Sequence, residues 1–196
     1  SARTIQLDLA PFNLIAATTR IAMISAPLRS RFSGGIFKLE FYTQEEIEQI
    51  VRRSAKLLKI EIDSDAVSEI AMRSRFTPRT ANYLLKRCRD YAQIHKHKLD
   101  KKSVDTALKL IGVDEKGLTH SDREILQTII KKFKGGPVGL NTLAASLSEE
   151  EATIEEFNEP YLLQLGLIER TPRGRIVTDT GYEHMESKAS DSGKLL

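Results

Sequence analysis

The spacing of apolar residues changes at Thr43, and this change limits the fold classes open to the chain. Before it, "TIQLDL" from Thr4 to Leu9 alternates apolar and polar residues, and "FNLIAATT" from Phe12 to Thr19 is a short continuous apolar run. Alternation is typical of a half-buried strand, and a short apolar run is typical of a strand buried in a parallel sheet. Beyond Thr43, apolar residues recur every three to four positions, which predicts helices. The sequence therefore predicts the end of an α/β domain followed by a mainly α-helical chain.

Four helices are expected in quick succession over residues 43–114. Thr43 can cap the first, with Glu46 as its capping-box partner, and Pro78 fits the first turn of the third because proline lacks an N–H. Such a series predicts a compact helical domain. Its expected inward-facing residues are Ile47, Ile50, Val51, Ser54, Leu57, Leu58, Ala81, Leu84, Leu85, Cys88, Ala92, Val104, Ala107, Leu108 and Ile111.

Three helices and a hairpin are expected over residues 115–185. The helices fall in "DREILQTIIKKF", "GLNTLAASLS" and "TIEEFNEPYLLQLG", and Gly135-Gly136-Pro137 ends the first of them. "LIER" and "RIVTDTG" form the two strands, and the order of these elements is that of a winged-helix domain. The remaining residues, 186–196, lack periodicity and are predicted to be a disordered tail.

Three arginines, Arg170, Arg173 and Arg175, fall within six residues at this hairpin. A solvated surface turn explains any one of them, but three guanidinium groups on one wing favour contact with DNA phosphates. The preceding helix is a poor candidate for the major groove, because it and its approach carry carboxylates that repel phosphates, namely Glu149, Glu150, Glu151, Glu155, Glu156 and Glu159. Backbone contacts carry little sequence information, so the expected DNA binding is structure-selective or nonspecific.

A second group of arginines, Arg20, Arg29 and Arg31, follows the strand predicted over 12–19. Solvated surface arginines are the simple explanation. A cation in this place could also reach a nucleotide bound by a neighbouring subunit, where it can contribute about 10³ to 10⁵ in rate by neutralising the transferring phosphoryl group. Arg79, at the start of the third helix, is another candidate phosphate contact.

Other patterns argue against further classes of protein or site. The net charge of +3 is too small to predict nucleic-acid binding by itself, the single Cys88 excludes an internal disulfide, and no apolar run is long enough to span a membrane. We therefore expect a soluble, cytoplasmic protein. "HKH" at His95 and His97, with His120 and His184 elsewhere, lacks the spacing of a metal site, so no metal site is expected and these histidines should be solvated.

No complete catalytic site can be assigned to the chain. The pattern G-x-x-x-x-G-K-[ST], whose loop holds nucleotide phosphates, does not occur in the sequence. "LIGVDE" from Leu110 to Glu115 is similar to the strand-Asp-Glu element that holds magnesium in nucleotide hydrolases. Because it follows a helical pattern, we interpret it as a helix end and linker. Autonomous ATP binding is therefore not expected.

Several segments, taken in order, resemble one family. "FNLIAATTR", "APLRSRF", "LEFY", "TPRTANYLLKRCRDYA" and the long stretch from "KGGPVGLNTLAAS" to "LGLIERTPRGR" are similar to the RuvB family, bacterial Holliday-junction branch-migration ATPases of the AAA+ class. The resemblance covers nearly the whole chain as far as Met185. It implies a homo-hexameric ring around duplex DNA that hydrolyses ATP with Mg²⁺ in recombination, repair and the SOS response, with RuvA as the partner that holds the junction.

The resemblance also implies roles for individual residues. Thr18 or Thr19 corresponds to sensor 1, which orients the attacking water, and Arg31 corresponds to the arginine finger offered to the ATP of the adjacent subunit. Arg79 corresponds to sensor 2 on the lid. The three arginines of the hairpin correspond to the wing that grips the DNA backbone.

The chain also departs from the family pattern. Ser30 and Ser33 replace the Asp and Gly of the usual "LRDRFG", which is expected to loosen the finger loop. The sequence starts within the hairpin before sensor 1 and lacks both nucleotide-binding motifs. We therefore expect a C-terminal fragment: the remnant of an AAA+ large domain over 1–42, a helical lid over 43–114 and a winged helix over 115–185. ATP and Mg²⁺ would be bound mainly by residues missing from this chain.

Two other interpretations stay open beside the motor subunit. A winged-helix DNA-binding or transcriptional module with a helical extension would need a basic recognition helix, which the glutamate-rich segment does not provide. A clamp-loader-like AAA+ subunit without translocase activity would share the finger and the lid but would need no arginine-rich wing.

Overall fold

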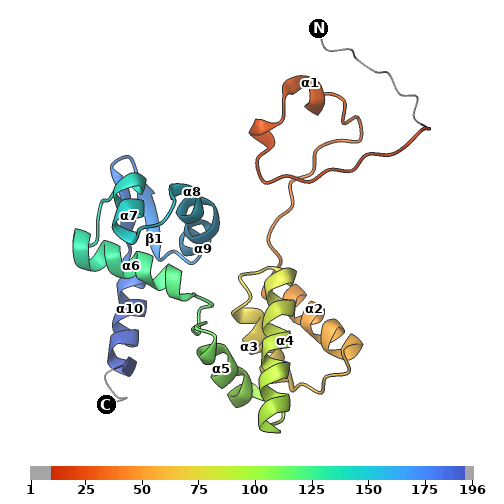
Figure 1. Ribbon diagram of the computed structural model, residues 1–196, viewed down its shortest axis with the longest axis vertical. Coiled ribbons are helices and arrows are strands. Elements are labelled where there is room, and N and C mark those ends of the chain that lie inside the picture. The colour runs from red at the N-terminus through yellow and green to blue at the C-terminus, as the bar shows by residue number, and fades with distance from the viewer. Residues whose placement is uncertain (1–9, 193–196) are drawn as a thin grey trace. The chain divides into compact units, whose positions relative to one another are not determined.

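The structure, a computed structural model, describes residues 10–192, with side chains described as far as residue 186. The chain divides into two units, Ser1–Glu40 and Phe41–Leu196 (Figure 1). The second unit contains two separate hydrophobic cores, one for a helical domain and one for a winged-helix domain.

The first unit forms no strand among its described residues. Its secondary structure consists of η1 (Ile21–Met23) and α1 (Ala26–Arg29), with irregular chain on both sides. The strand predicted over 12–19 is therefore wrong, and the one predicted over 4–9 lies outside the described residues. A strand of a parallel sheet needs hydrogen-bonding neighbours, and the described residues of this unit supply none. The side chain of Ile15 is accordingly 94% exposed.

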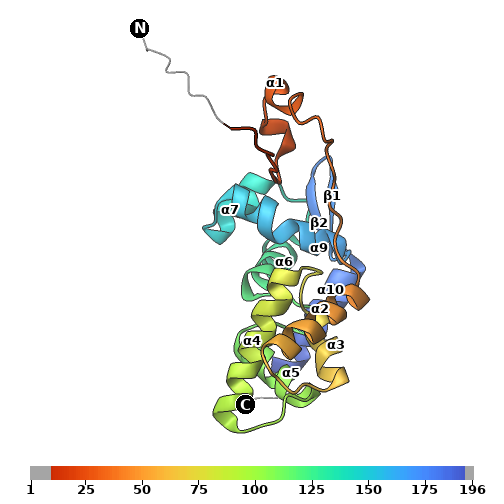
Figure 2. The ribbon, with the colours of Figure 1, turned by 90° about the vertical axis from the view of Figure 1, so that its right-hand side faces the viewer.

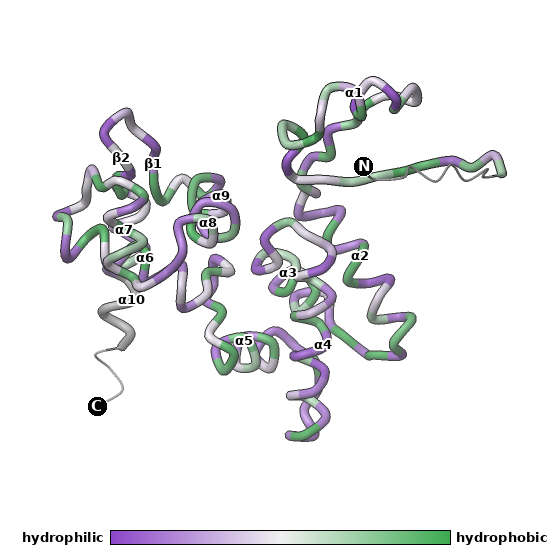
Figure 3. The backbone as a smooth tube through the Cα atoms, turned by 45° about the horizontal axis from the view of Figure 1, so that its top comes forward, coloured by the Kyte–Doolittle hydropathy of each residue, from purple (hydrophilic) through white to green (hydrophobic). Residues whose placement is uncertain are grey.

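The helical domain is built from α2 (Gln44–Leu57), α3 (Ser64–Met72), α4 (Pro78–His95) and α5 (Lys101–Leu110). α2 packs on α3 and α4, and α5 packs on the same two helices (Figures 1 and 2). Apolar and polar stretches alternate along α2 and α4, as expected of amphipathic helices that bury one face (Figure 3).

The capping box predicted at the start of α2 is confirmed. The Thr43 N–H donates to Glu46 Oε2 at 2.8 Å, and the Glu46 N–H donates to Thr43 Oγ1 at 3.2 Å. Both bonds satisfy N–H groups that have no partner within the helix, so this local sequence pattern fixes where the helical domain begins.

The inward face of α4 is confirmed, since its buried residues are Ala81, Leu84, Leu85, Cys88 and Ala92. Three predicted core residues at helix ends differ. Leu57 is 74% exposed, Leu58 39% and Ile111 38%. Each of these residues lies where a helix ends and the chain turns away from the core. The prediction continued the helical periodicity past the end of the helix, and so it placed these side chains in the core.

The winged-helix domain begins with α6 (His120–Phe133) and α7 (Leu140–Leu147). The single third helix predicted from the sequence is divided into α8 (Glu151–Thr153), a π-helical segment η2 (Ile154–Asn158) and α9 (Glu159–Gln164). A π-helical turn inserts an extra residue into the helix, so it changes which side chains face the core beyond it.

The predicted hairpin is present as β1 (Ile168–Thr171) and β2 (Gly174–Val177), which pair antiparallel (Figure 2). Val138 forms a further antiparallel bridge to Arg175, so the wing is attached to the chain that follows α6. The order of helices and strands confirms the predicted winged helix.

The described part of the chain ends in α10 (Asp179–Ser192), which packs on α6. Residues 186–192 are therefore helical in the structure, which differs from the disordered tail predicted over 186–196; residues 193–196 lie outside the described part. α10 contributes Met185, near its middle, to the core of the winged-helix domain.

Candidate nucleic-acid interface

The turn of the wing is shaped by Gly174 and Thr171. Gly174 has a φ of +134°, and a Cβ at this position would lie 2.3 Å from the carbonyl oxygen of Val138, so the turn requires glycine. The Thr171 hydroxyl donates to the Gly174 carbonyl at 2.8 Å and accepts from the Arg173 N–H at 3.3 Å. These bonds close the turn and leave Arg173 exposed at its tip.

The other two wing arginines are held by one buried carboxylate. Arg170 and Arg175 are directly opposite each other in the hairpin, so their side chains lie on the same face of it. Glu159 accepts hydrogen bonds from Nε and Nη2 of Arg170, at 2.7 and 2.9 Å, and from Nε and Nη2 of Arg175, at 3.0 and 3.1 Å. We refer to these three residues as the Glu159 clamp.

The Glu159 clamp alters the charge distribution predicted from the sequence. Glu159 is 1% exposed and so does not belong to the surface carboxylate cluster, whereas Glu149, Glu150, Glu151, Glu155 and Glu156 are exposed as expected. Burial raises the pKa of Glu159, but the hydrogen bonds from Arg170 and Arg175 lower it below its ordinary value, so Glu159 is ionised at neutral pH.

The three wing arginines therefore stand in different environments. Arg170 and Arg175 share Glu159, and Glu155 adds a contact of 3.6 Å with Arg170, so the two cations face two carboxylates. The guanidinium of Arg173 has no hydrogen-bond or ion-pair partner among the described residues. Arg173 is thus the wing cation that is open to a bound anion.

The residues matched to sensor 1 and to the finger lie in the first unit. Thr18, Thr19 and Arg31 are exposed. The Thr18 hydroxyl accepts a hydrogen bond from the Arg20 N–H at 3.0 Å. The Ser30 hydroxyl donates to the Pro27 carbonyl at 3.0 Å. The replacement of Asp by Ser30 was expected to loosen the finger loop, but Ser30 itself makes a hydrogen bond within that loop.

Arg79 lies in the first turn of α4, in the second unit. The preceding loop is held by the Thr77 hydroxyl, which donates to the Thr80 hydroxyl at 2.8 Å. Arg79 is exposed, and its guanidinium has no hydrogen-bond or ion-pair partner within the described part of the chain. A cation beside the unpaired N–H groups of a helix start is a favourable place for a phosphate.

Three family models match consecutive parts of the chain. Residues 1–38 match the Holliday junction DNA helicase RuvB P-loop domain, 42–114 the RuvB AAA lid domain, and 115–186 the RuvB C-terminal winged helix domain. The Holliday junction branch migration complex subunit RuvB of Koribacter versatilis is 54% identical over 189 residues, which make up 96% of this chain and 52% of that protein. The chain belongs to the RuvB family.

Solved RuvB structures share the fold. A mutant of Thermotoga maritima RuvB has a TM-score of 0.84 and 48% identity, covering 93% of this chain and 61% of the solved one. The T. maritima RuvB Holliday junction branch migration motor has a TM-score of 0.79 at 48% identity, covering 84% and 55%. The RuvB resemblance seen in the sequence is confirmed, and the chain spans about half the length of the curated relatives it matches.

A buried contact between His184 and Asp114 in this RuvB-family chain was not predicted from the sequence. His184 on α10 is 4% exposed and its Nε2 lies 3.0 Å from Asp114 Oδ2, so the prediction that it is solvated is wrong. Burial raises the pKa of Asp114, but hydrogen bonds from His184 and from the Leu118 N–H lower it below its ordinary value. Asp114 belongs to "LIGVDE", whose first residue, Leu110, ends α5 and whose other residues lead toward α6, so the segment is a helix end and linker, as interpreted.

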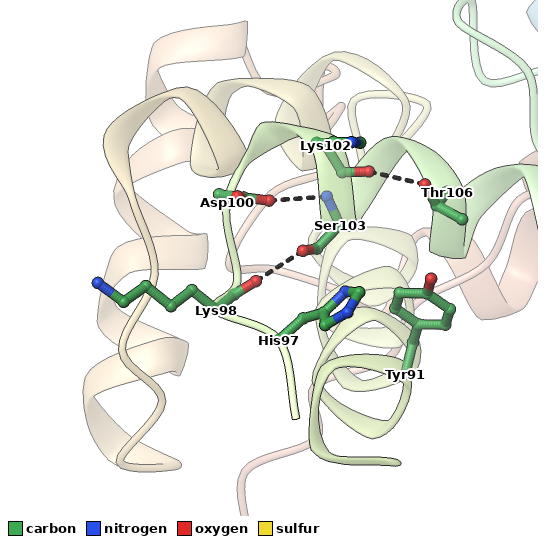
Figure 4. Close-up of a pocket in the computed structure, with 7 residues that line it drawn as sticks. All are labelled: Tyr91, His97, Lys98, Asp100, Lys102, Ser103 and Thr106. Carbon is green, nitrogen blue, oxygen red and sulfur yellow. Dashed lines mark hydrogen bonds between the residues drawn. The ribbon is translucent and has the colours of Figure 1, made fainter. Parts of the chain in front are cut away.

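A hollow of about 430 Å³ in the helical domain of this RuvB-family chain is lined by residues of α4, α5 and their connection (Figure 4). The Ser103 hydroxyl donates to the Lys98 carbonyl at 2.6 Å, and the Ser103 N–H donates to Asp100 at 2.8 Å. These bonds close the connection between the two helices, so the polar groups that line the hollow stabilise the fold.

Among the described residues, no group of three or more His, Cys, Asp or Glu could hold a metal ion. No helix within that part of the chain has the length and apolar character of a membrane span.

Proposed function

We propose that the chain supplies part of a subunit of a hexameric, ATP-driven DNA translocase that drives branch migration of Holliday junctions in the cytoplasm. Support comes from the family: the K. versatilis relative is described as a subunit of the branch migration complex, and a solved relative as a branch migration motor. The single observation that carries the DNA-binding part is Arg173, an exposed cation at the tip of a wing braced by the Glu159 clamp.

The wing is proposed to grip the phosphate backbone. Arg173 makes the direct phosphate contact, because its charge is not balanced by a described neighbour. Arg170 keeps 47% of its side chain exposed and can turn part of its guanidinium toward a phosphate, whereas Arg175, at 15%, acts mainly by fixing the wing through Glu159. The exposed glutamates of α8 and η2 would repel phosphates, so insertion of this helix into the major groove is disfavoured.

The nucleotide-binding part of the proposal rests on residues of both units. Arg79 fits a phosphate because it is an unpaired, exposed cation at a helix start, and it would act as sensor 2. Arg31 would act as the finger toward the ATP of a neighbouring subunit, and Thr18 or Thr19 would orient water. ATP, with its Mg²⁺, would supply the energy for translocation; RuvA and further copies of the subunit are the proposed protein partners.

The proposal is tested by titrating the chain with labelled four-way junctions of two unrelated sequences. Arg173→Ala should weaken binding to both junctions by a similar factor, because phosphate contacts carry no base information. Arg53→Ala is the matched control, since Arg53 is an exposed arginine of α2 with no ion-pair partner among the described residues. A loss of affinity confined to one junction sequence, or equal losses for Arg173→Ala and Arg53→Ala, would contradict phosphate gripping by the wing.

A further inference from the structure

The loop between α3 and α4 reaches out of the helical domain onto the winged-helix domain. Two adjacent residues of this loop, Arg75 and Phe76, have φ values of 54° and 52°, in the left-handed region that bulky side chains rarely adopt. Phe76 packs against the core of the winged-helix domain, with its ring centroid 6.4 Å from that of Tyr161. Such a backbone persists only where surrounding contacts hold it in place.

The contacts that hold the loop converge on Arg75. Its Nη2 donates to Asp122, and its guanidinium carbon lies over two aromatic rings, 4.8 Å from the centroid of Tyr161 and 5.5 Å from that of Phe157. Asp122 is fully buried, and the side chain of Arg75 is 13% exposed. A guanidinium enclosed by a carboxylate and two aromatic rings is a specific contact between domains, because only arginine combines a planar stacking surface with a fork of donors.

The Asp122 carboxylate also contacts residues that lie closer to the wing. Asp122 accepts the Thr119 N–H at 2.7 Å and the Asn158 Nδ2 at 2.8 Å. Asn158 is the residue before Glu159, which holds Arg170 and Arg175 in the clamp. Hydrogen bonds therefore connect the α3–α4 loop to Asn158, and one peptide bond further along the chain Glu159 holds the base of the wing.

The other end of that loop is the start of α4, where Arg79 is exposed four residues after Arg75. We propose that Arg75 is a positioning residue that fixes the winged-helix domain to the loop leading into α4, so that Arg79, at the start of α4, and the wing move as one body. The role given to Arg79 rests on the proposed function, whereas the mechanical link between the two domains does not.

The link is tested on the whole chain by the distance between two spin labels, attached through Lys86→Cys on α4 and Lys131→Cys on α6. Both positions are exposed, and burial raises the pKa of the native Cys88 thiol to about 12, so the native thiol does not compete for the label. The doubly labelled chain with Arg75 in place should give one narrow distance distribution. Arg75→Ala should broaden it, and Arg53→Ala, the matched exposed arginine of the same domain, should leave it narrow.

Two further variants separate the link from folding. Arg75→Lys keeps a cation but loses the planar fork. Asp122→Asn keeps one oxygen that can accept the Thr119 N–H but loses the charge and the acceptor for Asn158. Both variants should broaden the distribution while circular dichroism shows intact helices. An unchanged, narrow distribution in any folded one of these three variants would overturn the proposal. The failure of the proposed function is seen separately, because a chain that binds no four-way junction would refute DNA gripping without altering the label distances.

Discussion

Residues 10–40 and residues 41–186 contain apolar side chains in plenty, yet only the second set forms cores. Among residues 10–40 no side chain is buried, and Phe12, Ile15 and Phe37 are 68%, 94% and 83% exposed. Helices whose apolar faces match can bury one another within a short stretch of sequence, and a hairpin pairs with itself. A strand of a parallel sheet cannot be completed by nearby residues in this way, because its hydrogen-bonding neighbours come from distant segments of the chain. Apolar content alone therefore does not predict which part of a chain is stable.

The largest effect that would sharpen this comparison is expected from Asp122→Ala. It leaves the Arg75 guanidinium between the domains without its buried carboxylate, and removing one partner of a buried ion pair lowers the free energy of unfolding by about 3–5 kcal/mol. Urea unfolding measures the change. Glu124→Ala, which removes an exposed carboxylate of the same helix, should change stability by no more than about 0.5 kcal/mol. Equal effects of the two substitutions would show that the buried pair does not hold the second unit together.

The next test compares a core residue with an exposed one. Leu85 on α4 is fully buried, so Leu85→Ala should reduce the free energy of unfolding by about 2–5 kcal/mol through lost burial and the cavity left behind. Ile15→Ala in the first unit should stay within about 0.5 kcal/mol, because the side chain is already in water. A large loss of stability from Ile15→Ala would mean that residues 10–40 contribute a core to this chain after all.

A smaller effect is expected from Glu159→Gln, which removes the charge of the clamp and retains its shape. Stability should fall by about 1–3 kcal/mol at neutral pH, since hydrogen bonds to a charged group are lost. The pKa of Glu159 is lower in the folded chain than its ordinary value of 4.5, so the contribution of the clamp is present above that pH and is lost as the pH falls through the lowered value. Unfolding measured from pH 7 to pH 3 should therefore show the difference between the two proteins shrinking below pH 4.5; a constant difference would contradict the ionised clamp.

The helices and the wing could be predicted from the sequence because their signals are local. The Thr43 and Glu46 capping box, the inward face of α4 and the two short strands are all set by residues a few positions apart. The partners of the charged groups could not be predicted in this way. Asp122 is 47 residues from Arg75, and Asp114 is 70 residues from His184, so no periodicity connects them.

The candidate site shows the same division. The three arginines of the wing are visible in "RTPRGR", but their division into one open cation and two clamped ones depends on Glu159, which is 11 residues before Arg170. As one more carboxylate in a glutamate-rich segment, Glu159 carried no local signal of burial. The π-helical segment just before it changes the helix face that meets the wing, and this too has no simple pattern in the sequence.

The most direct test of the account is the salt dependence of junction binding for Arg173→Ala and Arg175→Ala, each against the unsubstituted chain. Plots of log affinity against log salt concentration should lose about 0.9 in slope for Arg173→Ala, the value for one phosphate contact. Arg175→Ala should change the slope less and lower stability more, because Arg175 is turned inward to Glu159. An unchanged slope for Arg173→Ala, or equal slope losses for the two variants, would contradict a wing that holds DNA through its tip and is braced by its base.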